Sequence, residues 1–144
     1  PFGADYFDGL LRDSGAVFDS EPPTTAILAA QTLAGRGLDL LHRLQRAHYV
    51  EGRRIADPAV LRALAVEIGL DAKAFDAAYE QAQGAETAAH IAASRRLLAQ
   101  VGGTGFPTLA LERNGAFTLL EPSRYLGRPE QWRDHLTARI QGGA

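Results

Sequence analysis

The sequence contains neither cysteine nor methionine. Without cysteine, the chain by itself forms no disulfide, no thiolate metal site and no cysteine nucleophile. Because methionine is missing even at the first position, we expect that Pro1 does not begin the translation product. A preceding segment is then expected to have been removed or left out.

The sequence also has no large excess of positive or negative charge and no long apolar run. The net charge of -2 and the pI of about 6.1 provide no basic surface of the kind that binds nucleic acid. No apolar run approaches the roughly 20 residues of a membrane span. We therefore expect no nucleic-acid or membrane partner. With 144 residues, 46% of them hydrophobic and 22% charged, the chain has the composition of a globular domain.

Helical patterns occupy most of the chain. Glycine ends several of them, and aspartate followed by proline or alanine begins others, as at Asp57 and Asp71. In the third pattern we expect an apolar face through Leu38, Leu41 and Leu44. The predicted helices are 1–15, 19–35, 38–52, 56–69, 70–84 and 85–103, with a last one at 129–140.

A β-hairpin is predicted between the last two helices. Asn114–Gly115 is a strong turn signal, because both central positions of the favoured turn need a positive φ. Leu119 and Leu120 are adjacent and so point to opposite faces of their strand. A strand that is apolar on both faces is usually covered on both sides. We therefore expect a larger sheet, whose other strands would belong to an N-terminal β segment left out of this chain.

The aromatic side chains are interpreted as core, with any exposed ones forming a hydrophobic substrate surface. This set comprises Phe2, Phe7, Phe18, Tyr49, Phe75, Tyr79 and Trp132. The histidines do not predict a metal site, because His42 and His48 are six residues apart and share no helix face well. Arg53 and Arg54 are interpreted as a charged loop, with a peptide-contacting rim as the alternative.

The order of these segments, with "GFPTL" at 105–109 between a long helix and a hairpin, resembles the DsbA-like family of thiol–disulfide oxidoreductases, in particular its protein-disulfide isomerase branch. The resemblance implies an α/β, thioredoxin-like fold with a large all-helical insertion. Residues 1–84 would form the insertion. Residues 85–144 would form the C-terminal half of the thioredoxin-like domain, with the cis-proline loop, the hairpin and the final helix.

The resemblance also implies a site. Pro107 would be cis, and Thr104, Gly105, Phe106 and Pro107 would bind substrate by exposing backbone to an extended peptide. The alternative is a trans proline that starts an edge strand. The family's Cys-x-x-Cys pair would lie upstream of Pro1. The chain itself therefore offers no catalytic residue, no metal ligands and no cofactor, and we expect it to have no redox activity alone.

The implied function is that of a thiol–disulfide oxidoreductase or protein-disulfide isomerase, with extended or unfolded protein as substrate. Whether this chain is itself an enzyme stays open. One alternative is a relative of the kappa-class glutathione transferases and chromene-carboxylate isomerases. Another is a redox-inactive peptide-binding module. Unpaired strands would permit a homodimer. The sequence does not decide between bacterial cytoplasm and periplasm.

Overall fold

A computed structural model describes residues 2–142, and Pro1 and residues 143–144 lie outside the described part. The chain divides into two compact units, residues 1–91 and 92–144. Each unit is described by itself below. The expected domain division between residues 84 and 85 stays a prediction.

The first unit begins with short helical turns, where the sequence predicted one helix over 1–15. A π-helical turn, η1, spans Asp5–Gly9, and a 3-10 turn, η2, spans Leu10–Arg12. The regular helix is broken at Gly9, whose φ of -102° and ψ of -83° lie outside the α region. Only Leu10 in these turns is buried.

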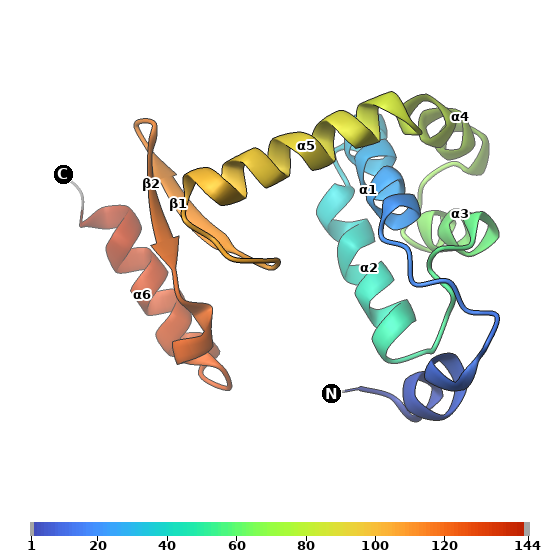
Figure 1. Cartoon of the computed structure of the whole chain (residues 1–144), viewed down its shortest axis with the longest axis horizontal. Helices are drawn as coiled ribbons and strands as arrows, with labels where there is room; N and C mark the ends of the chain where they lie inside the picture. The colour runs from blue at the N-terminus through green and yellow to red at the C-terminus, as the bar shows by residue number, and fades with distance from the viewer. Residues whose placement is uncertain (1, 143–144) are drawn as a thin grey trace. The chain divides into compact units, whose positions relative to one another are not determined.

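Four helices and the start of a fifth complete the first unit (Figure 1). Two of them are capped as predicted: the Asp57 carboxylate accepts from the N–H of Ala59, and the Asp71 carboxylate from the N–H of Ala74. These local signals work because a cap needs only residues one to three positions away. The helices are α1 (Glu21–Ala34), α2 (Gly37–Tyr49), α3 (Pro58–Glu67), α4 (Ala72–Ala82) and α5 (Ala85–Gln100).

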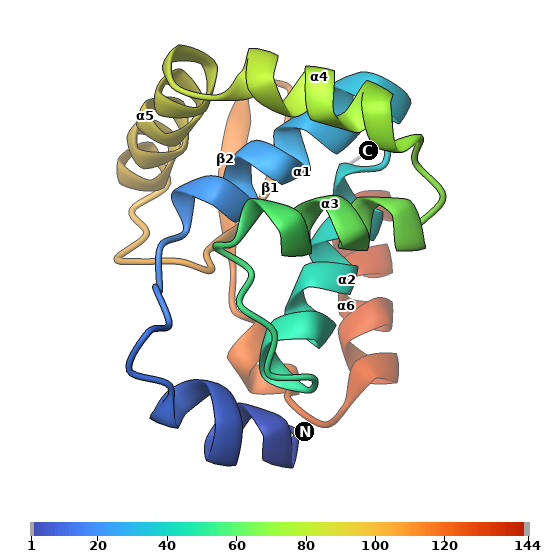
Figure 2. The same cartoon turned by 90° about the vertical axis from the view of Figure 1, so that its right-hand side faces the viewer.

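The core of the first unit lies where α1 packs against α2 and α4, with α3 beside them (Figure 2). Phe75 is its largest side chain and is 2% exposed. Alanines on α1 and leucines on α2 and α3 fill the rest, which allows close helix packing. The buried core residues are Ala26, Ala29, Ala30, Leu40, Leu44, Ala47, Leu61, Leu64, Ala65, Leu70 and Phe75.

Two expectations about this core are wrong. On α2 the buried stripe runs through Leu40, Leu44 and Ala47, whereas Leu38 is 78% exposed. The face is rotated because α1 and α3 both contact α2 and so set which side is covered. Of the aromatic set, Phe75 is core, but four members are exposed instead. They are Phe2, Phe7, Phe18 and Tyr49.

The second unit contains the rest of α5, the hairpin and the final helix. Strand β1 (Leu109–Arg113) pairs antiparallel with β2 (Ala116–Leu120), with Leu109 opposite Leu120. The turn is as predicted, with φ of 51° at Asn114 and 79° at Gly115. A 3-10 turn, η3 (Pro122–Tyr125), then leads to α6 (Pro129–Gln141).

The hairpin is the whole sheet within residues 2–142. One face bears Leu111, Arg113 and Thr118, and these line a cavity of about 350 Å³ together with α6. On the opposite face, Phe117 is 37% and Leu119 44% exposed. The hairpin thus has apolar residues on both faces, as expected, but one of these faces has little cover among the described residues.

Candidate functional site

The candidate substrate-binding residues Thr104–Pro107 form the connection from α5 to β1. The Phe106–Pro107 peptide bond is cis, as the resemblance implied. All four residues are exposed, and Phe106 is 66% exposed. The structure therefore places the four residues side by side on an open loop, in contact with solvent rather than with core.

Neighbouring residues hold the two ends of this loop. At its start, the N–H of Gly103 donates to the carbonyl of Leu98 at 2.9 Å, and a Cβ on Gly103 would overlap the side chains of Leu98 and Thr108. At its end, the hydroxyl of Thr108 donates to the carbonyl of Gly105 at 2.5 Å. A side chain at 103 would therefore have to displace the side chains of Leu98 and Thr108, and Thr108 ties the start of β1 back to the loop.

The loop's main chain retains free hydrogen-bonding capacity. Within residues 2–142, neither the N–H of Gly105 nor that of Phe106 has a hydrogen-bond acceptor. Pro107 has no N–H to offer. Exposed amides next to a strand are the groups that an extended peptide pairs with when it adds to a sheet edge. Chemically, the loop is suited to main-chain recognition.

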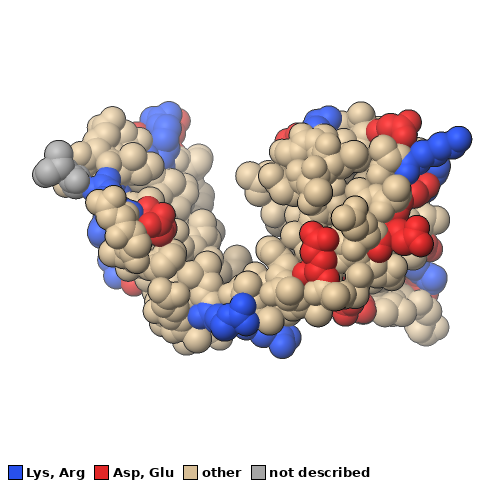
Figure 3. Space-filling view, turned by 90° about the horizontal axis from the view of Figure 1, so that it is seen from above, with Lys and Arg blue, Asp and Glu red and all other residues tan. Residues whose placement is uncertain are grey.

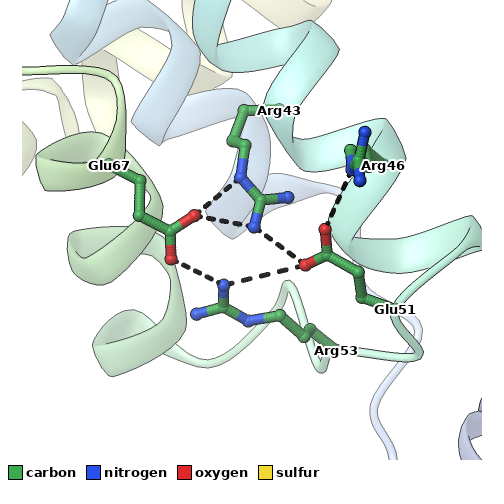
Figure 4. A network of polar contacts seen from close by, with 5 residues as sticks. All are labelled: Arg43, Arg46, Glu51, Arg53 and Glu67. Atoms are coloured by element: carbon green, nitrogen blue, oxygen red, sulfur yellow. Dashed lines mark hydrogen bonds and ion pairs between the residues drawn. The ribbon is translucent and has the colours of Figure 1, made fainter.

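The polar network on the first unit was not predicted from sequence. Arg43 donates through Nη2 to Glu51 at 2.8 Å and through Nε to Glu67 at 2.7 Å, and Arg53 donates to Glu67 at 2.9 Å (Figure 4). Arg46 adds a bond of 3.2 Å to Glu51. The hydrogen bond with Glu51 is the main cause of the raised pKa of Arg43. These residues come from α2, α3 and the loop between them.

The partners of Arg53 and Arg54 distinguish between the two interpretations of this segment, a charged loop and a peptide-contacting rim. Arg53 is held by Glu67, and Arg54 donates through Nε to Asp13 at 2.7 Å. That hydrogen bond is also the main cause of the lowered pKa of Asp13. Both guanidinium groups are therefore engaged within the chain, which favours the charged-loop interpretation over a peptide-contacting rim.

His48 lies in an aromatic cluster. Its ring centroid is 4.7 Å from that of Tyr49, 5.4 Å from Tyr6 and 6.0 Å from Phe18. Its Nδ1 is buried and has no hydrogen-bond partner in the described chain. Burial lowers the pKa of His48 because the charged imidazolium is poorly solvated there. The structure thus gives His48 a packing role among aromatic side chains, and no metal site was predicted for it.

Metal-binding clusters of three or more His, Asp or Glu side chains are absent from residues 2–142. His135, for example, stacks on Tyr125 with ring centroids 5.1 Å apart. In the same described part, no helix has the length and apolarity needed to cross a membrane. On the face shown in Figure 3, acidic and basic side chains are scattered among uncharged ones.

Comparison with known proteins identifies the family. The model of the DSBA-like thioredoxin domain matches residues 11–124. The cytosolic disulfide reductase DsbM from Pseudomonas aeruginosa is 54% identical, with a TM-score of 0.94, and the match covers 98% of this chain and 68% of that one. The same reductase solved with GSH is 53% identical, with a TM-score of 0.92 and the same coverage of both chains.

A third solved chain, from Nitrosomonas europaea, is 26% identical with a TM-score of 0.77. That match covers 100% of this chain and 67% of the other. No curated protein matches the sequence. The expected α/β, thioredoxin-like fold with a helical insertion is therefore confirmed. The chain belongs to the DSBA-like thioredoxin domain family of disulfide oxidoreductases and isomerases.

Proposed function

We propose that this chain supplies the substrate-binding part of a thiol–disulfide oxidoreductase, with Thr104–Pro107 as the substrate contact. The observation that carries the proposal is the 54% identity to a disulfide reductase over 98% of the chain. The exposure of the loop and the free amides of Gly105 and Phe106 support its role as the contact. The substrate is an extended or unfolded protein segment beside a disulfide.

The sulfur chemistry needs a dithiol that the 144 residues do not contain. Reduction of a substrate disulfide converts it to two thiols, and the two electrons come from a dithiol that becomes a disulfide. This chain's contribution is to hold the substrate main chain in place. We therefore expect that the chain alone does not accelerate the reduction of insulin by dithiothreitol. Acceleration above the rate in buffer would contradict this division of roles.

Peptide binding tests the loop directly. An isotope-labelled chain is titrated with a short extended peptide whose cysteine is blocked by S-methylation. We expect the amide resonances of Gly105, Phe106 and Thr108 to shift, and that of Gly9, in the first unit, to stay in place. Shifts confined to residues 2–91, or no saturable shift, would overturn the proposed site. The alternative function, a redox-inactive peptide-binding module, also predicts saturable peptide binding by this chain, which contains no cysteine.

Glutathione is a second candidate ligand, because the DsbM reductase from Pseudomonas aeruginosa has been solved with GSH. The same labelled chain is titrated with reduced glutathione. Shifts at Thr104–Pro107 would support glutathione binding, and their absence would leave the peptide as the ligand of this loop. The cytosolic description of that reductase favours the bacterial cytoplasm over the periplasm for the present chain.

We further propose that two copies of this chain associate through their hairpins. Each strand has one pairing partner in residues 2–142, and the face with Phe117 and Leu119 is partly exposed. Unpaired edges next to apolar side chains favour strand addition. Sedimentation over a concentration series is expected to show a dimer that Leu119→Lys dissociates. A monomer at every concentration would contradict it.

A further inference from the structure

The first residues of the chain lie against the end of α2 with little contact to the core. Residues 2–13, which we call the strap, comprise η1 and η2 and bury one side chain, that of Leu10. Phe2 is 59% and Phe7 49% exposed. No residue of the strap belongs to the core that the structure describes in the first unit. Because segments with few buried apolar contacts open at low free energy, we expect that the strap detaches without unfolding of the helices.

Close backbone contacts dock the strap on the end of α2 and the loop that follows. The N–H of Gly3 donates to the carbonyl of Tyr49 at 2.9 Å. A Cβ on Gly3 would overlap the carbonyl of Val50. In the same way, a Cβ on Gly52 would overlap the carbonyl of Asp5. A cavity of about 660 Å³ separates other parts of the strap from this loop, so the docking is close at two points and incompletely packed elsewhere.

His48 is the titratable side chain at which the strap meets α2. The ring of Tyr6, on the strap, packs edge-on against the imidazole with centroids 5.4 Å apart, and that of Phe18 packs at 6.0 Å. Nδ1 of His48 is buried and has no hydrogen-bond partner in the described chain. Because an imidazolium donates from both ring nitrogens, a protonated His48 needs an acceptor or water at Nδ1. The docked strap provides neither.

The charged side chains of the strap and the adjoining loop are engaged with one another rather than with His48. Their ion pairs are Asp8–Arg12, Asp13–Arg54, Glu51–Arg43, Glu51–Arg46 and Arg53–Glu67. The titratable groups whose rings pack on His48 are the phenols of Tyr6 and Tyr49. Burial lowers the pKa of His48, the backbone of Arg53 opposes this shift, and neither Asp5 nor another carboxylate contributes to it. A charge on His48 is therefore uncompensated while the strap is docked.

We propose that the strap is a pH-sensitive latch, which is docked on α2 while His48 is neutral and detaches when His48 binds a proton. This inference does not rest on the proposed function. Docking is complete above pH 6.5, the ordinary value for the imidazole. As the pH falls below this value, proton binding favours the detached strap, in which water solvates the imidazolium. The core of α1–α4 stays packed, because the strap contributes none of its residues.

Backbone dynamics of the isotope-labelled full chain test the latch between about pH 7.5 and about pH 5. This range lies above 4.5, the ordinary value for Glu51 and Glu67. The N–H order parameters of Phe7 and Leu11 are expected to fall from about 0.85, typical of rigid backbone, to below about 0.6. This fall should follow the titration of the His48 ring protons. The order parameters of the core residues α3 61–64 should stay high throughout.

Two histidine variants separate His48 from other effects of pH. His48→Phe keeps an aromatic ring that binds no proton, and we expect its strap to stay ordered down to about pH 5. His42→Phe is the matched control, because His42 lies on the same helix with an exposed side chain. Its strap should detach over the same pH range as in the wild type.

Four results would overturn the latch. One is a wild-type strap that stays ordered while His48 titrates, which would show that the aromatic rings accommodate the imidazolium. Another is a strap that is already mobile at about pH 7.5. A third is loss of order in the core residues together with the strap, because the proton would then act on the whole unit. The fourth is detachment of the strap in His48→Phe over the wild-type range.

Discussion

Leu38 and Leu40 lie two positions apart on α2 and have opposite surroundings. Leu38 is 78% exposed, and Leu40 is 0% exposed within the core of the first unit. The two side chains are chemically identical, so any difference between their substitutions reports the environment alone. They provide a matched pair for measuring how much core packing contributes at a single residue.

We predict that Leu40→Ala lowers the free energy of unfolding by about 2–5 kcal/mol, because it removes buried methyl groups and leaves a cavity. Leu38→Ala should change it by about 0.5 kcal/mol or less, as exposed substitutions usually do. Urea denaturation followed by far-ultraviolet circular dichroism measures both. Equal losses for the two variants would show that the assigned face of α2 is wrong.

At the same scale, some residues were predictable and others were not. Asp57 and Asp71 were identified as caps because capping depends on hydrogen bonds to residues two and three positions along the chain. The buried face of α2 was not, since both Leu38 and Leu40 fit an apolar helix pattern. Which one is covered depends on α1 and α3, and no local signal reports their placement.

At the scale of elements, a pair of buried hydroxyls joins α1 to α5. The Oγ1 atoms of Thr25 and Thr87 are 2.9 Å apart. Thr25 Oγ1 is also 3.0 Å from the carbonyl of Glu21, and Thr87 Oγ1 is 2.8 Å from that of Ala82. Both side chains are almost fully buried, at 1% and 0% exposure. The two hydroxyls therefore provide hydrogen-bond partners for each other and for the carbonyl of Ala82 at the end of α4, where water has little access.

We predict that Thr25→Val lowers the free energy of unfolding by about 1–3 kcal/mol, because it leaves the Thr87 hydroxyl with one partner fewer in a buried place. The double variant Thr25→Val with Thr87→Val should lose less than the sum of the two single losses, since no hydroxyl is then left unpaired between α1 and α5. Thr24→Val is the control, because the Thr24 hydroxyl bonds only to Ser20 of its own segment. Strict additivity would contradict the pairing.

In the hairpin segment, the sequence predicted the turn but not the 3-10 turn that follows the second strand. Asn114–Gly115 determines the turn because glycine and asparagine tolerate the positive φ that the turn needs. The register with Leu109 opposite Leu120 follows from that turn. The 3-10 turn η3 was not predicted, since its four residues are too few for a periodic pattern.

At the scale of the whole molecule, stability depends on charges brought together from distant positions. Arg43, Glu51 and Glu67 form a partly buried network in which the guanidinium of Arg43 contacts both carboxylates. Hydrogen bonds from Arg43 and Arg53 lower the pKa values of Glu51 and Glu67 from 4.5. Burial lowers the pKa of His48 from 6.5. Each pKa shift makes the free energy of unfolding depend on pH.

The pKa values of His48, Glu51 and Glu67 are all lower in the folded chain than in the unfolded chain. In the unfolded chain these groups bind protons more readily than in the folded chain, so acid favours unfolding. His48 contributes stability that is present above pH 6.5 and is lost as the pH falls from there towards its lower folded pKa. Glu51 and Glu67 contribute stability that is present above pH 4.5 and is lost below it. We therefore predict one decline in stability that begins below about pH 6.5 and a second that begins below about pH 4.5.

Urea denaturation at a series of pH values tests this prediction. His48→Gln should flatten the decline that begins below about pH 6.5 and leave the decline caused by the two carboxylates unchanged. Arg43→Met should lower stability at neutral pH by about 1–3 kcal/mol, because two carboxylates lose a charged hydrogen-bond donor, and should reduce the decline below pH 4.5. A wild-type stability that is flat from pH 7 to pH 5 would contradict the role of His48.

By itself, the sequence determined the helices after residue 20, their caps and the hairpin turn, because each depends on residues within a few positions of one another. The cis-proline loop was located through the resemblance to a known family. The tertiary structure alone decided which face of α2 is buried, which aromatic side chains are exposed, and that Arg43, Glu51 and Glu67 meet. These features depend on contacts between segments far apart in the chain, which local patterns do not encode.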